Sequence, residues 1–243
     1  MPVRLFVDLP LPAAGGGTLV LPAAAARHAQ VRRVQPGDTL WLFDGSGREW
    51  TAEVTLMGRH DVTVQLGAVQ VVDRELRCAV TLAVGMPAND RMDALVEKAT
   101  ELGVVQVQPL QCERSVLRLD GERAQRKQAH WQAIAEAASE QSGRARVPRI
   151  EPVRSLRDWL QRATRPAVAL LLSPDREAPP LRQVAAGVTA SSLCALSGPE
   201  GGLSAAEEAA ALAAGFVATS LGPRVLRADT APLALLAWVG LSV

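Results

Sequence analysis

The chain has 243 residues, of which 48% are hydrophobic and 21% charged, and its formal net charge is +1. This apolar content is sufficient for one large domain, or for a small domain joined to a larger one, and excludes an intrinsically disordered protein. No run of about 18 apolar residues is present, and Pro2 and Asp8 interrupt any signal-peptide pattern at the amino terminus. We therefore expect a cytoplasmic protein that does not span a membrane.

The cysteines and histidines form no recognisable site. Cys78, Cys112 and Cys194 are odd in number and far apart, which suits neither a disulfide framework nor a paired-cysteine zinc site. The three histidines are equally scattered, and no HExxH helix occurs. The sequence predicts reduced, buried thiols and no metal.

The positive charge is uneven along the chain. A net charge of +1 argues against a nucleic-acid partner, because phosphate binding requires Lys and Arg, but it does not exclude one. Residues 114–149 gather more cations than acids, namely Arg114, Arg118, Arg123, Arg126, Lys127, Arg144, Arg146 and Arg149. The planar fork of Arg matches phosphate, although a GC-rich genome would also replace Lys by Arg throughout.

Residues 1–73 are predicted to form a small β-barrel. Short apolar runs alternate with turn signals, and residues 39–43 and 50–56 flank the Asp44-Gly45 turn as the two strands of a hairpin would. Residues 60–66 alternate as a third strand, and a helix is expected at residues 23–33. The spacing of these turns is typical of a small β-barrel.

From residue 74 to 243 strand-like and helix-like runs alternate, which is typical of an α/β domain with a parallel sheet. Asn89 or Asp90 is expected to cap a helix that ends at Gly103. The other expected strands are residues 78–84, 104–110, 167–172 and 193–197, and the other expected helices are residues 122–141 and 155–163.

A glycine-rich turn follows the strand that ends at Ser197. Its residues are Gly198, Pro199, Glu200, Gly201 and Gly202, and Ser204 with Glu207 then forms a capping box for a helix. Glycine lets backbone groups approach a flat ligand, and α/β sheets bind ligands at such strand ends. A tight strand-to-helix connection would need glycine as well, so this turn alone does not establish a site.

A second turn of the same kind lies between residues 219 and 232. A short strand meets Gly222 and Pro223, and a helix begins at Asp229 or Thr230 with Pro232 in its first turn. Two such turns imply one shared pocket. Neither turn carries a P-loop or a Rossmann fingerprint, which disfavours an ATP or NAD enzyme.

Together with five upstream segments, the two turns resemble the bacterial ribosomal RNA small subunit methyltransferase E family, whose members methylate N3 of a uridine in the decoding region of 16S rRNA. The matching segments are residues 34–38, 43–45, 97–104, 113–115 and 136–144. The chain departs from the family's usual residues at Arg32, Leu203 and the pair Ala228 and Asp229.

The resemblance implies a PUA-like RNA-binding barrel at residues 1–73 and a SPOUT-type α/β domain with a trefoil knot at residues 74–243. It also implies S-adenosyl-L-methionine as cofactor, 16S rRNA or the small ribosomal subunit as partner, and a homodimer. The residues that it assigns to the cofactor are Leu172, Ser197, Gly198, Pro199, Glu200, Gly201, Gly202, Ser220, Leu221, Gly222, Val225, Leu226, Thr230 and Ala231.

The chemistry of methyl transfer to uracil N3 suggests roles for three further side chains. A cation near N3 would favour the anion that forms there, and Arg114 and Arg227 are the candidates. Glu200 is the candidate base, or it hydrogen-bonds its own turn, and solvent could also take the proton. The residues expected to contact RNA are Arg32, Arg33, Arg114, Arg144, Arg146, Arg224 and Arg227. Arg224 and Arg227 could instead be solvated loop charges, and Arg144 and Arg146 solvated charges at a helix end. The alternative function is a non-catalytic RNA-binding or ribosome-assembly protein.

Overall fold

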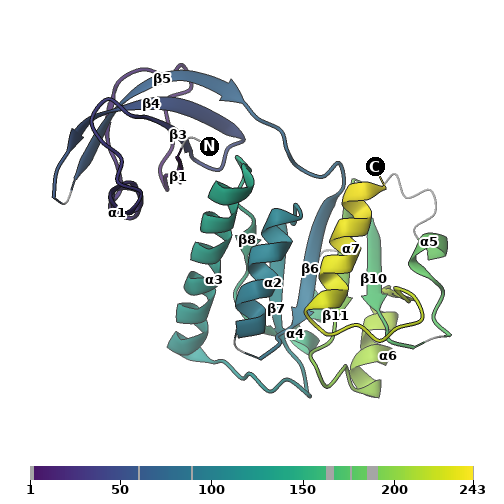
Figure 1. The fold of residues 1–243 in the computed structure, drawn as a ribbon. Coiled ribbons are helices and arrows are strands. Elements are labelled where there is room, and N and C mark those ends of the chain that lie inside the picture. Colours follow the sequence, from purple (N-terminus) through teal and green to yellow (C-terminus); the bar gives the residue numbers. More distant parts are fainter. Residues whose placement is uncertain are drawn as a thin grey trace. The chain divides into compact units, whose positions relative to one another are not determined.

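The chain folds into two compact units, each with its own sheet (Figure 1). The computed structural model describes residues 3–59, 61–88, 90–162, 167–175, 177–184 and 191–242. The first unit contains the residues up to Glu75 together with Glu136–Val147, and the second contains Leu76–Ala135 and the residues from Pro148 onward. The sequence predicted a division after residue 73 and did not anticipate that residues 136–147 pack with the first unit.

In the described residues, the first unit consists of a five-stranded sheet, one helix of its own and the carboxyl end of α3 (Gly121–Ser142). The strand order is β1-β3-β4-β5-β2, in which β1 and β3 are parallel and the other neighbours antiparallel. The predicted hairpin is present, and Leu42 pairs with Trp50 across it. The elements are β1 (Arg4–Phe6), β2 (Thr18–Val20), α1 (Ala23–Val31), β3 (Thr39–Phe43), β4 (Arg48–Met57) and β5 (Val62–Val71).

Two details of the first unit differ from the sequence prediction. Helix α1 ends two residues before the predicted Arg33, because Arg33 adopts a left-handed backbone conformation with φ +57° that ends the helix. Strand β5 begins at Val62; His60, where the sequence placed its start, lies outside the described residues. Alternate residues of β3, β4 and β5 point into a core that α1 covers with Ala25, Ala26 and Ala29.

The second unit is built on a seven-stranded sheet in which every pairing is parallel. The order is β12-β10-β11-β6-β7-β8, and β9 also pairs with β7. Its strands are β6 (Ala79–Gly85), β7 (Gln106–Gln111), β8 (Arg149–Ile150), β9 (Arg154–Ser155), β10 (Val168–Leu172), β11 (Ser192–Ser197) and β12 (Val217–Thr219). Because the strands are parallel, their carboxyl ends meet at one edge of the sheet.

Helices cover both faces of this sheet. Helices α4 and α6 pack on one face over Ala83, Cys194 and Leu196, and α2 and α7 lie side by side on the other (Figure 1). The helices are α2 (Asp90–Glu101), α3 (Gly121–Ser142), α4 (Leu156–Arg162), α5 (Leu181–Val184), α6 (Ala205–Ala213) and α7 (Thr230–Leu241). Asn89, the other candidate cap of α2, and Ala163, the predicted end of α4, lie outside the described residues.

Three further predictions concern the cysteines, membrane-spanning helices and metal ligands. All three cysteines are buried and free of disulfides, as expected. No helix in the described ranges is long and apolar enough to cross a bilayer. Nor do three or more His, Cys, Asp or Glu side chains gather there as ligands for a metal ion.

Candidate cofactor and RNA site

The predicted glycine turn connects β11 to α6 at the carboxyl edge of the sheet. The predicted capping box is present: the Ser204 hydroxyl accepts a hydrogen bond from the Glu207 N–H at 3.2 Å, and the Glu207 carboxylate accepts one from the Ser204 N–H at 2.9 Å. This reciprocal pair satisfies two N–H groups at the start of α6 and fixes where the turn ends.

Close contacts favour glycine at two positions of this turn. A Cβ atom on Gly198 would lie 2.9 Å from the backbone nitrogen of Leu203, and one on Gly201 would lie 3.0 Å from the Cβ of Arg114. These two glycines therefore serve the packing of the turn. Gly202, with φ +69°, and Gly222, with φ +115°, differ, because a Cβ atom on either would meet nothing within 4 Å.

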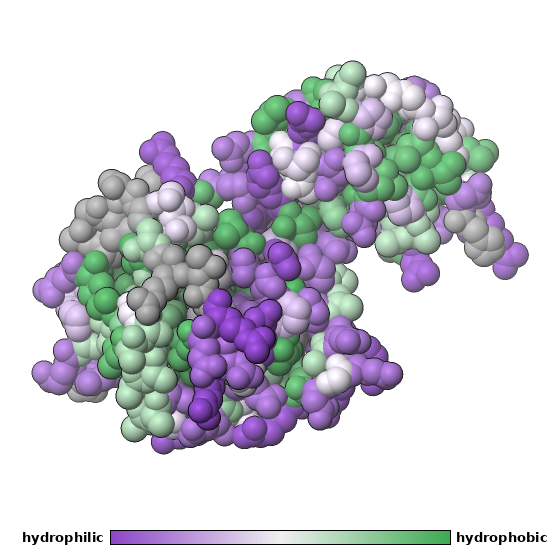
Figure 2. Space-filling view, turned by 180° about the vertical axis from the view of Figure 1, so that it is seen from behind, coloured by the Kyte–Doolittle hydropathy of each residue, from purple (hydrophilic) through white to green (hydrophobic). Residues whose placement is uncertain are grey.

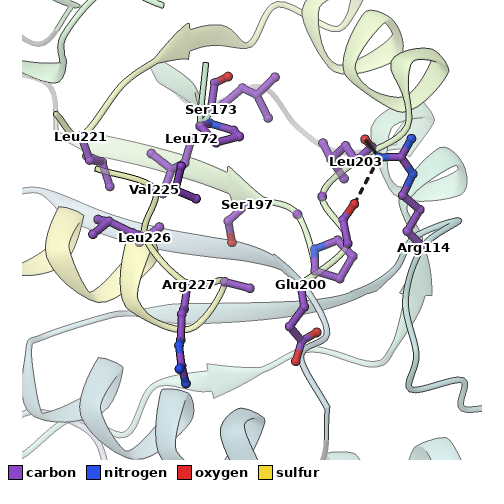
Figure 3. A pocket seen from close by; sticks show the side chains of 18 of the residues that line it. Arg114, Leu172, Ser173, Ser197, Glu200, Leu203, Leu221, Val225, Leu226 and Arg227 are labelled. Carbon is purple, nitrogen blue, oxygen red and sulfur yellow. Dashed lines mark hydrogen bonds between the residues drawn. The ribbon is translucent and has the colours of Figure 1, made fainter. Parts of the chain in front are cut away.

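A cavity of about 700 Å³ opens at this edge, between the glycine turn, the end of β10 and the turn before α7 (Figure 3). Its volume is typical of a small-molecule site. It is lined by Arg91, Arg114, Leu171, Leu172, Ser173, Pro174, Ser197, Gly198, Pro199, Glu200, Gly201, Gly202, Leu203, Glu208, Leu221, Gly222, Arg224, Val225, Leu226, Arg227, Ala228 and Ala231.

The lining suits a ligand with a flat apolar part and polar groups. The apolar side chains of Leu172, Val225 and Leu226 line the cavity (Figure 3). The Ser197 hydroxyl is buried and has no hydrogen-bond partner among the described residues, although it lines the cavity. A buried hydroxyl without a partner costs free energy, which a polar ligand atom would recover. These features fit S-adenosylmethionine, with its adenine ring and polar ribose.

Most of the predicted cofactor residues line this cavity, and two do not. Ser220 instead shapes the second turn: its hydroxyl donates to the Gly222 carbonyl at 3.1 Å and accepts from the Gly222 N–H at 3.2 Å. Thr230 is exposed in the first turn of α7, and its hydroxyl contacts Asp229. Both lie outside the cavity lining.

Four residues that line the cavity were not predicted from the sequence, namely Arg91, Pro174, Glu208 and Ala228. Arg91 comes from the first turn of α2, just after β6, and reaches the cavity because β6 and β11 are neighbours. The rule that parallel strands end at one edge could have pointed to this segment. Glu208 lies one residue beyond the capping-box Glu207, and no local signal marks it.

The three residues predicted to act in the chemistry have different surroundings. Glu200 accepts hydrogen bonds from the N–H of Ala88 at 2.9 Å and from Arg91 at 3.4 Å, rather than from its own turn. Arg114 donates to the carbonyls of Gly201 and Leu203, both at 3.1 Å. Arg227 is exposed and extends along the cavity wall (Figure 3).

Of the arginines predicted to contact RNA, most have exposed side chains and one is buried. Arg224 and Arg227 are exposed at the cavity, and Arg32, Arg33 and Arg146 are exposed on the first unit. The prediction that Arg144 contacts RNA was wrong. Only 4% of its side chain is exposed, and its guanidinium forms two hydrogen bonds with Glu75. A guanidinium buried against a carboxylate has no surface to offer a phosphate, so the predicted RNA contact of Arg144 does not fit the structure.

Burial raises the pKa of two cysteine thiols in the second unit. Burial raises the pKa of Cys194 to about 12, and burial together with the nearby Glu207 carboxylate raises that of Cys112 to about 12. The thiolate is the nucleophilic form, so these raised pKa values disfavour a nucleophilic role for either cysteine near neutral pH.

Comparisons with known proteins agree with the geometry. A family model described as an RNA methyltransferase domain matches residues 74–240, and one described as an RNA methyltransferase PUA domain matches residues 21–67. A Mycobacterium bovis protein named ribosomal RNA small subunit methyltransferase E is 35% identical over 242 residues, which cover 99% of this chain and 92% of that protein.

Two solved structures are similar over nearly the whole chain. A methyltransferase from Legionella pneumophila, solved with bound S-adenosylmethionine, has a TM-score of 0.93 and 30% identity, covering 100% of this chain and 98% of the other. The small subunit methyltransferase E of Neisseria gonorrhoeae, also bound to S-adenosylmethionine, has a TM-score of 0.88 and 35% identity, covering 98% and 96%.

These likenesses confirm the predicted fold class, a SPOUT-type α/β domain with a parallel sheet preceded by a PUA-like domain. The threading of the knot itself stays a prediction. The family model covers more than half of the chain, and the M. bovis relative is matched over most of its length. The chain therefore belongs to the ribosomal RNA small subunit methyltransferase E family.

Proposed function

We propose that this protein uses S-adenosylmethionine to methylate N3 of a uridine in the decoding region of 16S rRNA. The observation that carries the proposal is the cavity at the strand ends, where the unpartnered Ser197 hydroxyl and the open positions beside Gly202 and Gly222 suit this cofactor. Relatives at 30% and 35% identity bind S-adenosylmethionine in their solved structures, which supports the same ligand here.

When bound, S-adenosylmethionine supplies a methyl group on a positively charged sulfur, ready for in-line displacement. The protein then has to hold uracil N3 in line with that methyl group and favour the loss of the N3 proton. N3 lies on the Watson–Crick edge, so the base must be unpaired or turned out of its stack. Arg227, exposed on the cavity wall, is our candidate for stabilising the charge that develops on the base.

The RNA backbone would be held by arginines around the cavity and on the PUA-like unit. Arg91, Arg114, Arg224 and Arg227 line the cavity against the acids Glu200 and Glu208. We propose Arg224 at the cavity, and Arg32, Arg33 and Arg146 on the first unit, as phosphate contacts, while Arg227 contacts the reacting base of the RNA. Free 16S rRNA and the assembled subunit are both candidate substrates, and either would place the protein in the cytoplasm.

We also propose that the protein is a homodimer. After Thr230, helix α7 carries only apolar residues, so it has no polar face to turn toward solvent. Leu241 at its end is 88% exposed, and Val225 in the turn before it is 74% exposed. Apolar surface around α7 favours burial against a second copy. Figure 2 views the molecule from the opposite side, where hydrophobic side chains lie among hydrophilic ones.

The experiment that tests the proposed function is a methyl-transfer assay with the purified protein. Calorimetry should detect S-adenosylmethionine binding, and labelled methyl should move from the cofactor to 16S rRNA or to small subunits. RNA binding without any binding of the cofactor would instead support a non-catalytic RNA-binding or assembly protein.

A further inference from the structure

The segment 198–204, here called the cofactor loop, is held from two sides by neighbouring strand-to-helix segments. We propose that Glu200 and Arg114 are positioning residues that fix this loop in its binding conformation, so that Glu200 is not the base and Arg114 is not the cation at N3. This inference rests on the proposed function and assigns roles within its site.

On one side, Glu200 joins the loop to the segment between β6 and α2. Its Oε1 atom accepts hydrogen bonds from the Ala88 N–H at 2.9 Å and from Arg91 Nη1 at 3.4 Å. The carboxylate points away from Ser197 (Figure 3), and only 27% of the side chain is exposed. Glu200 thus satisfies an N–H group just before α2, where a negative charge is also favoured by the helix dipole.

Next to these hydrogen bonds, the backbone of Gly85 at the end of β6 packs closely against Pro199. A Cβ atom on Gly85 would lie 2.5 Å from both the Cδ and the nitrogen of Pro199. The end of β6 therefore touches the loop one residue before Glu200. Together the steric contact and the hydrogen bonds hold residues 198–200 against the segment that leads into α2.

On the other side, Arg114 joins the loop to the segment after β7. Its Nη1 atom donates to the carbonyls of Gly201 and Leu203, both at 3.1 Å, and one of these bonds is drawn in Figure 3. The N–H of Glu113 donates to the Glu207 carboxylate at 2.8 Å, which fixes the start of α6 as well. The loop is thus bonded to side chains or backbone from both flanking segments.

These bonds argue against a direct chemical role. A base must direct a carboxylate oxygen at the N3 proton, whereas the Ala88 N–H and Arg91 direct Glu200 Oε1 at the start of α2. The Nη1 atom of Arg114 donates to two carbonyls of the cofactor loop, so this nitrogen is directed at the loop and not at the centre of the cavity. Fixing the loop before the ligand arrives lowers the ordering cost of binding, which is how such residues raise affinity.

The test compares Glu200→Ala with Glu200→Gln, because an amide oxygen still accepts the Ala88 N–H bond but cannot act as a base. We expect Glu200→Ala to raise the Kd and KM for S-adenosylmethionine about tenfold, the effect of losing a charge-assisted hydrogen bond. Glu200→Gln should recover most of that affinity, with a kcat-versus-pH profile of the wild-type shape. Glu122→Ala, an exposed acid at the start of α3, is the matched control.

Three outcomes would overturn the inference. A Glu200→Gln variant that binds the cofactor normally but loses kcat as completely as Glu200→Ala would identify a base. An Arg114→Ala variant with unchanged Kd and a large loss of kcat would identify a cation at the reacting base. Unchanged amide hydrogen exchange of residues 198–204 in both alanine variants would show that neither residue holds the loop.

Hydrogen exchange also separates this inference from the proposed function, since it is measured on the protein alone. If the wild-type protein failed to bind S-adenosylmethionine, the proposed function would fail. Faster exchange of the loop in Glu200→Ala and Arg114→Ala, with circular dichroism showing a folded chain, would still support the positioning roles.

Discussion

Gly85, the last residue of β6, lies so close to Pro199 that a Cβ atom on Gly85 would stand 2.5 Å from the proline ring and its nitrogen. The backbone of Gly85 is not in the left-handed region, so the requirement for glycine is steric alone. Two neighbouring parallel strands thus bring their ends together at the point where the cofactor loop begins. The tightness of this contact makes the position a sensitive probe of the loop.

Gly85→Ala should therefore destabilise the second unit by about 2 kcal/mol, the usual cost of forcing an extra methyl group into a packed site. It should also weaken S-adenosylmethionine binding, because Pro199 and the loop must move. Urea unfolding and calorimetry measure the two effects. Gly240→Ala is the control, since its Cβ would meet only the flexible end of the Leu76 side chain at 3.3 Å. Equal behaviour of the two variants would contradict this account of Gly85.

Ser197→Ala should separate stability from binding. The Ser197 hydroxyl is buried without a partner among the described residues, so its removal should leave the melting temperature unchanged or slightly raised. Cofactor affinity should fall about fivefold, or about 1 kcal/mol, if the hydroxyl bonds a polar atom of the ligand. A variant that loses stability and keeps its affinity would show that the hydroxyl has a structural role instead.

Arg144 and Arg146 should respond in opposite ways to alanine substitution. Arg144→Ala leaves Glu75 without its buried partner and should destabilise the first unit by about 3 kcal/mol. Arg146 is exposed, with its guanidinium beside the backbone of Gly47, so Arg146→Ala should leave stability unchanged. If Arg146 contacts RNA, its loss should reduce the salt dependence of RNA binding by about one phosphate contact.

Denaturation of both variants and filter binding at several salt concentrations distinguish the two roles. Loss of RNA affinity in a stably folded Arg144→Ala variant would restore the original assignment of Arg144.

The contrast between these two arginines shows what local sequence can predict. The Ser204 capping box and the hairpin through Leu42 and Trp50 were predicted, because both depend on spacing within a few residues. The burial of Arg144 was not, since its partner Glu75 lies 69 positions away in the sequence. The bond from Ala88 to Glu200 spans 112 positions and was missed for the same reason.

The sequence predicted the two glycine turns of the candidate site and a pocket shared by both. The two glycine turns are local patterns, but their shared cavity depends on the order of the strands in the sheet, which periodicity does not reveal. The cofactor and the knotted fold class followed from the family resemblance alone. Ser220 and Thr230 were assigned by their place in a motif, and the structure puts their side chains outside the cavity lining.

Glu136→Gln should change how the stability of the first unit depends on pH. Burial raises the pKa of Glu136, and the Asp8 and Glu140 carboxylates raise it further. A carboxyl group whose pKa is raised by folding stabilises the folded state below the unfolded pKa, and this stability is lost as pH rises through the folded pKa. The glutamine variant cannot ionise, so its urea midpoint should exceed that of the wild type at pH 7.5 and match it more closely at pH 4.5. An advantage that is the same at both pH values would contradict this prediction.

The central claim is that the protein methylates N3 of a uridine in 16S rRNA. Mass spectrometry of nucleosides from 16S rRNA, isolated from cells with and without the gene, tests it most directly. We predict that 3-methyluridine is present in the first sample, absent from the second and restored by the wild-type gene. Undiminished 3-methyluridine in 16S rRNA from cells without the gene would contradict the claim.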